Sequence, residues 1–169
     1  MSELSCLVIE DEPGIGWAIR RLLEQTGARV IVAVNGASAL EHLATETVSV
    51  ILLDVKLPDA DGFELAGVIN QMAPAIPIVI ISAYFYPNDP KVRQMLDRGV
   101  ARRFIAKPFR HEELLCAVRD LLAPKAPPLG GAQRSIQVWS ANHSSQSTGC
   151  RIGPRTAAKH QQNPLTRPQ

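Results

Sequence analysis

Several features that mark other protein classes are missing from this sequence of 169 residues. The N-terminus, from Met1 to Glu12, lacks the basic region and the long apolar stretch of a secretory signal peptide. No apolar run reaches the length of a membrane-spanning helix, so we expect no membrane association. The three cysteines are an odd number and lack the spacing of a zinc site. These absences predict a cytoplasmic protein.

Acidic residues are absent from the C-terminal part of the chain. Residues 1–124 carry 12 Lys and Arg and 16 Asp and Glu, whereas residues 125–169 carry six basic residues and no acidic one. This part is rich in Pro, Gly, Ser and Gln and is too short for a core of its own, so we expect it to be disordered. We therefore predict a folded domain over residues 1–123 and a basic tail over residues 124–169. No DNA-binding pattern follows residue 123, and such dispersed charges favour a solvated arm over a nucleic-acid contact.

Strand and helix patterns alternate five times within residues 1–123. Short apolar runs between turn signals predict strands that are buried on both faces, and stretches with apolar residues at helical spacing follow them. We expect strands at 6–9, 29–33, 50–53, 78–81 and 101–106, and helices at 15–23, 37–45, 63–72, 91–98 and 112–122. Strict alternation with short connections predicts an α/β fold, a doubly wound five-stranded parallel sheet with helices on both faces. For this sheet we take the strand order 2-1-3-4-5.

Four of the five predicted strands end in a polar or ionisable side chain. Glu10 and Asp11 follow the first strand, Asp54 the third, Ser82 the fourth and Lys107 the fifth. In a sheet of this order, these strand ends converge at one edge, beside the topological switch point. Clustered carboxylates there suit a hard divalent cation such as Mg²⁺, and a lysine with a hydroxyl suits the oxygens of a phosphoryl group.

Each of these residues also has a simpler interpretation when it is taken alone. Asp11 or Asp54 alone would more often cap a helix or a turn, and Lys107 alone would be a solvated charge. Their joint position at the ends of the right strands favours a common site. Asp59 and Asp61, in contrast, are expected to shape the turn that follows rather than to bind metal.

Taken together, these motifs resemble the receiver domain of response regulators, the phosphoacceptor half of two-component signalling. The resemblance covers residues 4–123. It rests on the acidic pair, the D-x-x-L-P-x-x-D-G block that begins at Asp54, the hydroxyl of Ser82, and Lys107-Pro108. It implies a flavodoxin-like fold and a chain that works as a phosphorylation switch.

The resemblance implies a role for each acidic residue. Asp54 would accept a phosphoryl group from the phosphohistidine of a sensor histidine kinase or of a histidine phosphotransfer protein. Asp11, Asp54 and the backbone carbonyl of Lys56 would ligate Mg²⁺, and Glu10 would act through a bound water. Lys56 and Tyr84 also flank the site where residues of this family tune water access to the phosphoryl group, and the bulk of Tyr84 would shield it.

The remaining site residues would support and read out the modification. Lys107 would pair with Asp54 and later with the phosphoryl oxygens, and a cis peptide bond to Pro108 would aim its ammonium at the site. Ser82 would move to bond the phosphoryl group. Phe104, which would be a core residue by default, would rotate inward behind it.

Two other functions compete with this interpretation. An Mg²⁺-dependent phosphohydrolase with an aspartate nucleophile would need a second carboxylate where Lys56 stands, which argues against this function. A receiver-like interaction module that works without phosphorylation is the stronger alternative. The interval from Ser82 to Phe104 is a few residues longer than usual, through Tyr84 to Asn88. This leaves the shape of the fourth helix and its loop open.

The predicted output is contact with other proteins. We expect a stand-alone receiver without an output domain, and no enzyme activity beyond Mg²⁺-dependent self-phosphotransfer and slow autodephosphorylation. Its downstream target is unknown. A homodimer through the fourth and fifth elements is a further candidate assembly.

Overall fold

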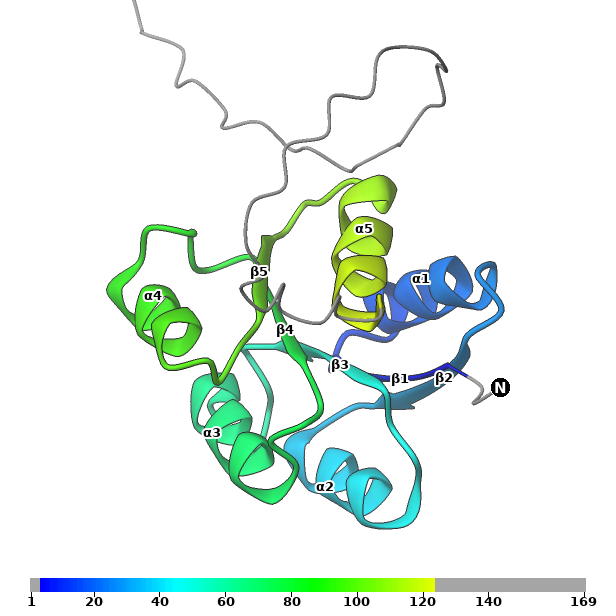
Figure 1. Ribbon diagram of the computed structural model, residues 1–169, viewed down its shortest axis with the longest axis horizontal. Coiled ribbons are helices and arrows are strands. Elements are labelled where there is room, and N and C mark those ends of the chain that lie inside the picture. Colours follow the sequence, from blue (N-terminus) through cyan, green and yellow to red (C-terminus); the bar gives the residue numbers. More distant parts are fainter. Residues whose placement is uncertain (1–3, 124–169) are drawn as a thin grey trace, which may run out of the picture. The chain divides into compact units, whose positions relative to one another are not determined.

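Five parallel strands form the centre of the protein in the computed structural model, which describes residues 4–123 (Figure 1). The strands are β1 (Ser5–Ile9), β2 (Arg29–Ala33), β3 (Val50–Asp54), β4 (Ile78–Ser82) and β5 (Arg103–Ala106). They lie in the order β2-β1-β3-β4-β5. The predicted doubly wound α/β fold and its strand order are therefore confirmed. The predicted tail over residues 124–169 lies outside the described residues, so its predicted disorder stays a prediction.

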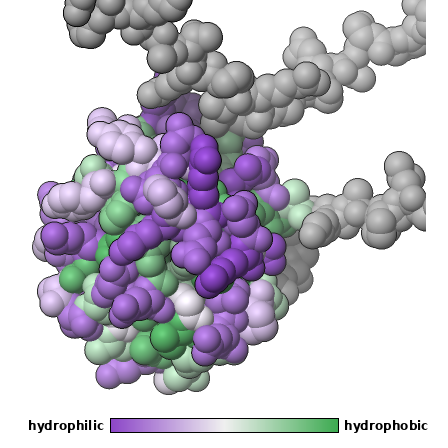
Figure 2. Space-filling view, turned by 90° about the vertical axis from the view of Figure 1, so that its left-hand side faces the viewer, coloured by the Kyte–Doolittle hydropathy of each residue, from purple (hydrophilic) through white to green (hydrophobic). Residues whose placement is uncertain are grey.

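Helices cover both faces of the sheet (Figure 1). Two of them pack on one face, α1 (Pro13–Glu24) and α5 (His111–Leu122). Three pack on the other face, α2 (Gly36–Thr45), α3 (Gly62–Met72) and α4 (Pro90–Asp97). No helix of residues 4–123 is long and apolar enough to cross a membrane. The face on the side of α3 and α4 is mainly hydrophilic, with smaller hydrophobic areas between (Figure 2).

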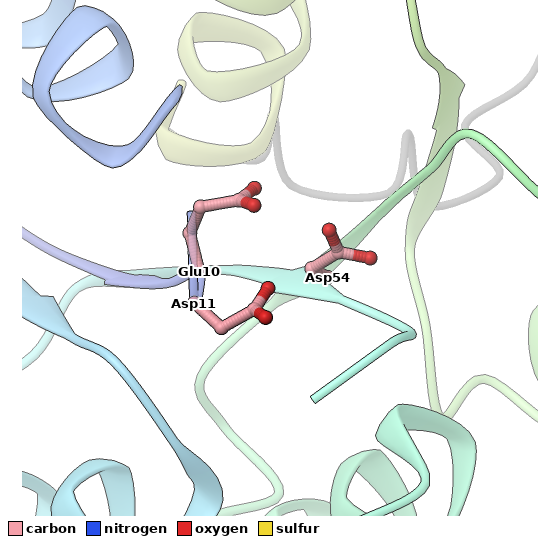
Figure 3. A group of neighbouring side chains, drawn as sticks. All are labelled: Glu10, Asp11 and Asp54. Carbon is pink, nitrogen blue, oxygen red and sulfur yellow. The ribbon is translucent and has the colours of Figure 1, made fainter. Parts of the chain in front are cut away.

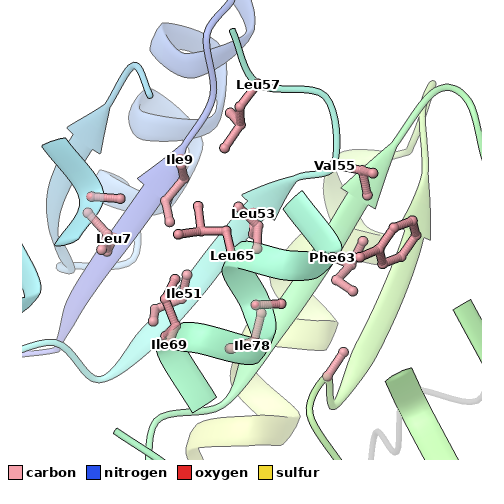
Figure 4. Packing of buried hydrophobic residues seen from close by; sticks show 14 of the residues in the cluster. Leu7, Ile9, Ile51, Leu53, Val55, Leu57, Phe63, Leu65, Ile69 and Ile78 are labelled. Carbon is pink, nitrogen blue, oxygen red and sulfur yellow. The ribbon is translucent and has the colours of Figure 1, made fainter. Parts of the chain in front are cut away.

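The core consists of one apolar layer on each side of the sheet. Successive side chains of a strand point to opposite faces, so β1 sends Leu7 and Ile9 toward α2 and α3, and Cys6 and Val8 toward α1 and α5. The three inner strands β1, β3 and β4 are buried along their whole length, as expected for strands covered on both faces. Figure 4 shows the layer beneath α3. Burial raises the pKa of the Cys6 thiol to about 11, so this thiol is protonated and unreactive.

The limits of most elements agree with the sequence prediction to within one or two residues. Gly27 and Gly99 follow α1 and α4 with positive φ angles of 82° and 68°, the left-handed conformation that ends helices at glycine. The predicted start of the fifth strand was wrong, because β5 begins at Arg103 and not at Ala101. The Ala101 amide donates instead to the Met95 carbonyl of α4, at 3.1 Å.

Candidate functional site

The predicted polar residues meet at the carboxyl edge of the sheet. Glu10 and Asp11 directly follow β1, Asp54 is the last residue of β3, Ser82 is the last residue of β4, and Lys107 directly follows β5. Parallel pairing holds these strand ends level, because Ile9 pairs with Leu53 and Ser82 with Ala106. The carboxylates extend from the ends of β1 and β3 into the same space (Figure 3).

Lys107 joins two of the carboxylates. Its Nζ lies 2.5 Å from Asp54 Oδ2 and 2.6 Å from Glu10 Oε2. The three side chains are largely withdrawn from solvent, with 11% of the lysine side chain exposed, 7% of Asp54 and 3% of Glu10. Charges that are desolvated to this extent are tolerated only when they are paired and hydrogen-bonded. The lysine therefore compensates two buried acids at once.

The pKa values of the paired groups reflect this burial. Desolvation raises the pKa of Glu10 to about 7, because the opposing hydrogen bond and charge of Lys107 offset only part of it. Desolvation alone would lower the pKa of Lys107. Its hydrogen bonds to Asp54 and Glu10 outweigh this effect, so the pKa of Lys107 is raised and the ammonium stays charged.

Asp11 completes a group of three acids that could hold a metal ion. One carboxylate oxygen from each of Glu10, Asp11 and Asp54 lies within 4.8 Å of the other two. Asp11 is exposed to solvent, whereas the other two acids are buried. Carboxylate oxygens are the ligands that Mg²⁺ and Ca²⁺ prefer, so the donor set fits a hard divalent cation.

Ser82 and Phe104 lie next to the acids on β4 and β5. Ser82 is fully buried, and its Oγ accepts a hydrogen bond from the Tyr84 amide at 3.1 Å. Phe104 is half-buried and packs against the apolar layer on the α4 side of the sheet. The Lys107–Pro108 peptide bond is cis, as the family resemblance implies.

The loop between β3 and α3, residues 55–61 (the β3–α3 loop), folds tightly around Asp54. The Lys56 amide donates to Asp54 Oδ1 at 3.0 Å, and the Gly62 amide donates to the Val55 carbonyl at 2.8 Å. Position 62 accepts only glycine here, because a Cβ would lie 2.5 Å from both the Asp54 carbonyl oxygen and Val55 Cα. Asp61 caps α3 by accepting from the Phe63 amide at 2.8 Å, which agrees with its predicted turn role.

Three interactions at the site were not predicted from the sequence. Lys107 pairs directly with Glu10 as well as with Asp54. Asp59 caps a different helix, α2, in addition to lying in the predicted turn. Lys56 Nζ lies 5.1 Å from the centre of the Tyr84 ring, in a cation–π contact. Only the third contact had a signal in the sequence. Lys56 comes two positions after Asp54 and Tyr84 two positions after Ser82, so both were expected to flank the site.

Comparison with known proteins places this site in a family. The family profile of the response regulator receiver domain matches residues 6–119. The transcriptional regulatory protein KdpE of Mycobacterium tuberculosis is 40% identical over 113 residues, which are 67% of this chain and 48% of KdpE. A 14.6 kDa protein of Leptolyngbya boryana is 31% identical over 122 residues, which are 71% of this chain and 91% of that protein.

A solved structure supports the same assignment. The response regulator protein TrrA of Thermotoga maritima, crystallised in complex with Mg²⁺-BeF, superposes with a TM-score of 0.62 at 28% identity over 70% of this chain and 99% of TrrA. The chain spans about half the length of most of the curated relatives that it matches. The matched region contains every residue of the acidic site and its lysine. This chain belongs to the response regulator receiver domain family.

Proposed function

We propose that this protein is a phosphoacceptor switch in which Asp54 takes a phosphoryl group from a phosphohistidine. The donor would be a sensor histidine kinase or a histidine phosphotransfer protein. The observation that carries the proposal is the position of Asp54, buried at the end of β3 with Lys107 Nζ 2.5 Å away and Asp11 and Glu10 beside it. A structural carboxylate would not need two further acids and an ammonium around it.

In the proposed transfer, an Asp54 carboxylate oxygen attacks phosphorus while the bond from phosphorus to the histidine nitrogen breaks. The nitrogen keeps the electron pair of that bond, and a proton already carried by the other ring nitrogen makes the leaving group a neutral imidazole, so the products are an aspartyl phosphate and a neutral histidine. Lys107 neutralises charge on the phosphoryl oxygens, because its raised pKa keeps it protonated. Water later cleaves the acyl phosphate and returns inorganic phosphate and the free carboxylate. We therefore propose no enzyme activity on other substrates.

The acidic group would hold Mg²⁺ in this reaction. Asp11, Asp54 and the backbone carbonyl of Lys56 are the proposed ligands, with Glu10 acting through water. When it is bound, Mg²⁺ supplies positive charge that offsets the charge on the phosphoryl oxygens. Both the oxygen donor set and the crystallisation of TrrA with Mg²⁺-BeF support this choice of cation.

The proposed readout uses the loop between β4 and α4, residues 83–89 (the β4–α4 loop). The Ser82 hydroxyl would turn from the Tyr84 amide to a phosphoryl oxygen, and Phe104 would rotate inward. This moves the surface around α4, which would then contact a downstream protein or a second copy of the chain. A phosphorylation switch of this kind adds charge at one point and biases a loop with two arrangements. We propose that the protein acts in the cytoplasm and that its receiver domain works through contacts with other proteins.

Intact-mass analysis tests the phosphoacceptor directly. The full chain is incubated with acetyl phosphate and Mg²⁺, alongside Asp54→Asn and a wild-type sample with EDTA. We expect the mass of one phosphoryl group on the wild type alone, and its loss on treatment with hydroxylamine, which cleaves acyl phosphates. A folded wild-type protein that gains no mass would refute the proposal and favour the phosphorylation-independent interaction module.

A further inference from the structure

Asp59 connects the β3–α3 loop to a helix that lies far away in the sequence. Its Oδ1 accepts from the Gly36 amide at 2.8 Å, and its Oδ2 accepts from the Ala37 amide at 3.0 Å. These amides belong to the first turn of α2, 23 and 22 positions earlier in the chain. The two hydrogen bonds lower the pKa of Asp59, so the carboxylate is charged at neutral pH.

The first turn of α2 depends on this contact. A helix leaves its first four amides without partners inside the helix. In α2, the Asn35 side chain satisfies one of them, because its Oδ1 accepts from the Ser38 amide at 2.8 Å. Two more, the amides of Gly36 and Ala37, donate to Asp59. The start of the helix is therefore capped jointly by its own N-cap residue and by the β3–α3 loop.

The contact between Asp59 and α2 also restrains the end of the β3–α3 loop that adjoins Asp54. Two residues separate Lys56 from Asp59, and neither is free to move. Leu57 is 9% exposed and belongs to the apolar layer beneath α2 and α3, and Pro58 has a fixed φ angle. At the other end, the Lys56 amide is bonded to Asp54 Oδ1. The segment from Lys56 to Asp59 is thus bonded to Asp54 at one end and to α2 at the other, which leaves the backbone of Lys56 little conformational freedom.

We propose that Asp59 is a positioning residue of the metal site. By fixing the β3–α3 loop to α2, it holds the backbone of Lys56 in place beside Asp54 and so maintains the affinity for Mg²⁺. Neighbours of this kind, which touch no metal themselves, commonly set the orientation of the groups that do. The inference rests on the proposed function, because it assumes that the acidic site binds Mg²⁺.

A Mg²⁺ titration of the metal-free full chain, followed by the backbone amide NMR signals around Asp54, tests this role. Asp59→Ala should raise the dissociation constant by about tenfold, the low end of the roughly 10- to 100-fold loss that is typical when a group that orients metal ligands is replaced. Asp59→Asn removes the charge but keeps one acceptor oxygen, so its rise should be smaller. Asn35→Ala is the matched control, because it weakens the same helix terminus without touching the loop, and it should leave the dissociation constant unchanged.

Each alternative gives a different pattern in this titration. If only the negative charge mattered, Asp59→Asn and Asp59→Ala would weaken binding equally. If Asp59 only stabilised α2, Asn35→Ala would weaken Mg²⁺ binding as much as Asp59→Ala does. Either pattern would overturn the positioning role, as would wild-type affinity in Asp59→Ala. A wild-type protein that binds no Mg²⁺ would overturn both this inference and the proposed metal site. Hydrogen exchange without metal adds a second readout, in which Asp59→Ala should speed exchange at Gly36 and Ala37.

Discussion

The two loops that flank Asp54 are held in different ways. The β3–α3 loop is bonded to α2 through Asp59 and closed on itself by the contact from Gly62 to Val55. The hydrogen bonds of the β4–α4 loop within the described residues join positions at most five apart. Tyr84 and Tyr86 in this second loop are 65% and 72% exposed. One loop is thus tied to the rest of the fold, and the other is held mainly by its own short-range contacts.

This difference suits the two tasks of a phosphorylation switch. Phosphoryl transfer needs Asp54 and its neighbours at fixed positions, because a charged site works only when its geometry is set in advance. Signalling needs a segment whose arrangement changes at low cost. A ring contact with α3 also restrains the β4–α4 loop, since Phe85 packs edge-on against Phe63 with ring centres 4.9 Å apart. We expect this contact to set how easily the loop moves.

The largest effect is expected from closing the space at position 62. In Gly62→Ala, the new Cβ would press on the backbone of Asp54 and Val55, so the β3–α3 loop must open, at a cost of about 3 kcal/mol in the free energy of unfolding. Gly67→Ala is the control on the same helix, where a Cβ meets nothing within 4 Å, and it should stabilise by about 1 kcal/mol. Urea unfolding measures both. Equal stability of the two variants would show that the loop is not tightly closed.

A pH-dependent effect is expected from Glu10, which pairs with Lys107 beside Asp54. In the metal-free protein its pKa is about 7, above the ordinary 4.5, so the folded state binds this proton more readily than the unfolded state does. The stability that this group contributes is therefore present below pH 4.5 and lost as the pH rises toward 7. Glu10→Gln should remove that loss, so the difference in unfolding free energy between wild type and variant should change across this window. A constant difference would contradict the assigned burial of the charge.

Removing the aromatic contact should loosen the β4–α4 loop. Phe85→Ala loses the edge-on contact with Phe63, which is worth about 1 kcal/mol in comparable pairs. Tyr86→Ala, at an exposed position of the same loop, should change stability by no more than about 0.5 kcal/mol. We expect hydrogen exchange in the loop to rise in the first variant and to stay unchanged in the second. If both variants behave alike, Phe85 is not the restraint.

The smallest effect concerns the contact that spans the two loops. Tyr84 lies against Lys56 across the site, and the bulk of its ring would limit the access of water to the acyl phosphate. Tyr84→Ala should admit more water and shorten the lifetime of the phosphoryl group by about twofold, which corresponds to about 0.4 kcal/mol in the barrier to hydrolysis. Loss of mass with time after removal of acetyl phosphate measures it. A lifetime as long as that of the wild type would refute the shielding role.

The elements and the members of the site could be predicted because their signals are local. Apolar runs such as Ile51 to Leu53 identify a strand by themselves, and the polar residue that ends each run lies at the edge of a parallel sheet. Alternation of strands and helices then predicts a parallel sheet with helices on both faces. For this reason Glu10, Asp11, Asp54 and Lys107 could be grouped into one site from the sequence alone.

The contacts that could not be predicted depend on distant parts of the chain. The bond from Lys107 to Glu10 joins residues 97 positions apart and depends on how two long side chains share a buried space. Asp59 stands in a turn motif, and only the approach of α2 shows that its carboxylate caps that helix. The start of β5 shifted because the Ala101 amide found a partner in α4. None of these outcomes has a signature within a short stretch of sequence.

Hydrogen exchange on the phosphorylated and unphosphorylated protein tests most directly whether phosphorylation of Asp54 moves one loop and leaves the other in place. Wild-type protein treated with acetyl phosphate and Mg²⁺ would be compared with Asp54→Asn under the same conditions. We predict that exchange changes at residues 83–89 in the wild type alone, while the amides of Gly36, Ala37 and Gly62 keep their protection. Equal changes in both loops, or a change confined to the β3–α3 loop, would contradict this division of roles.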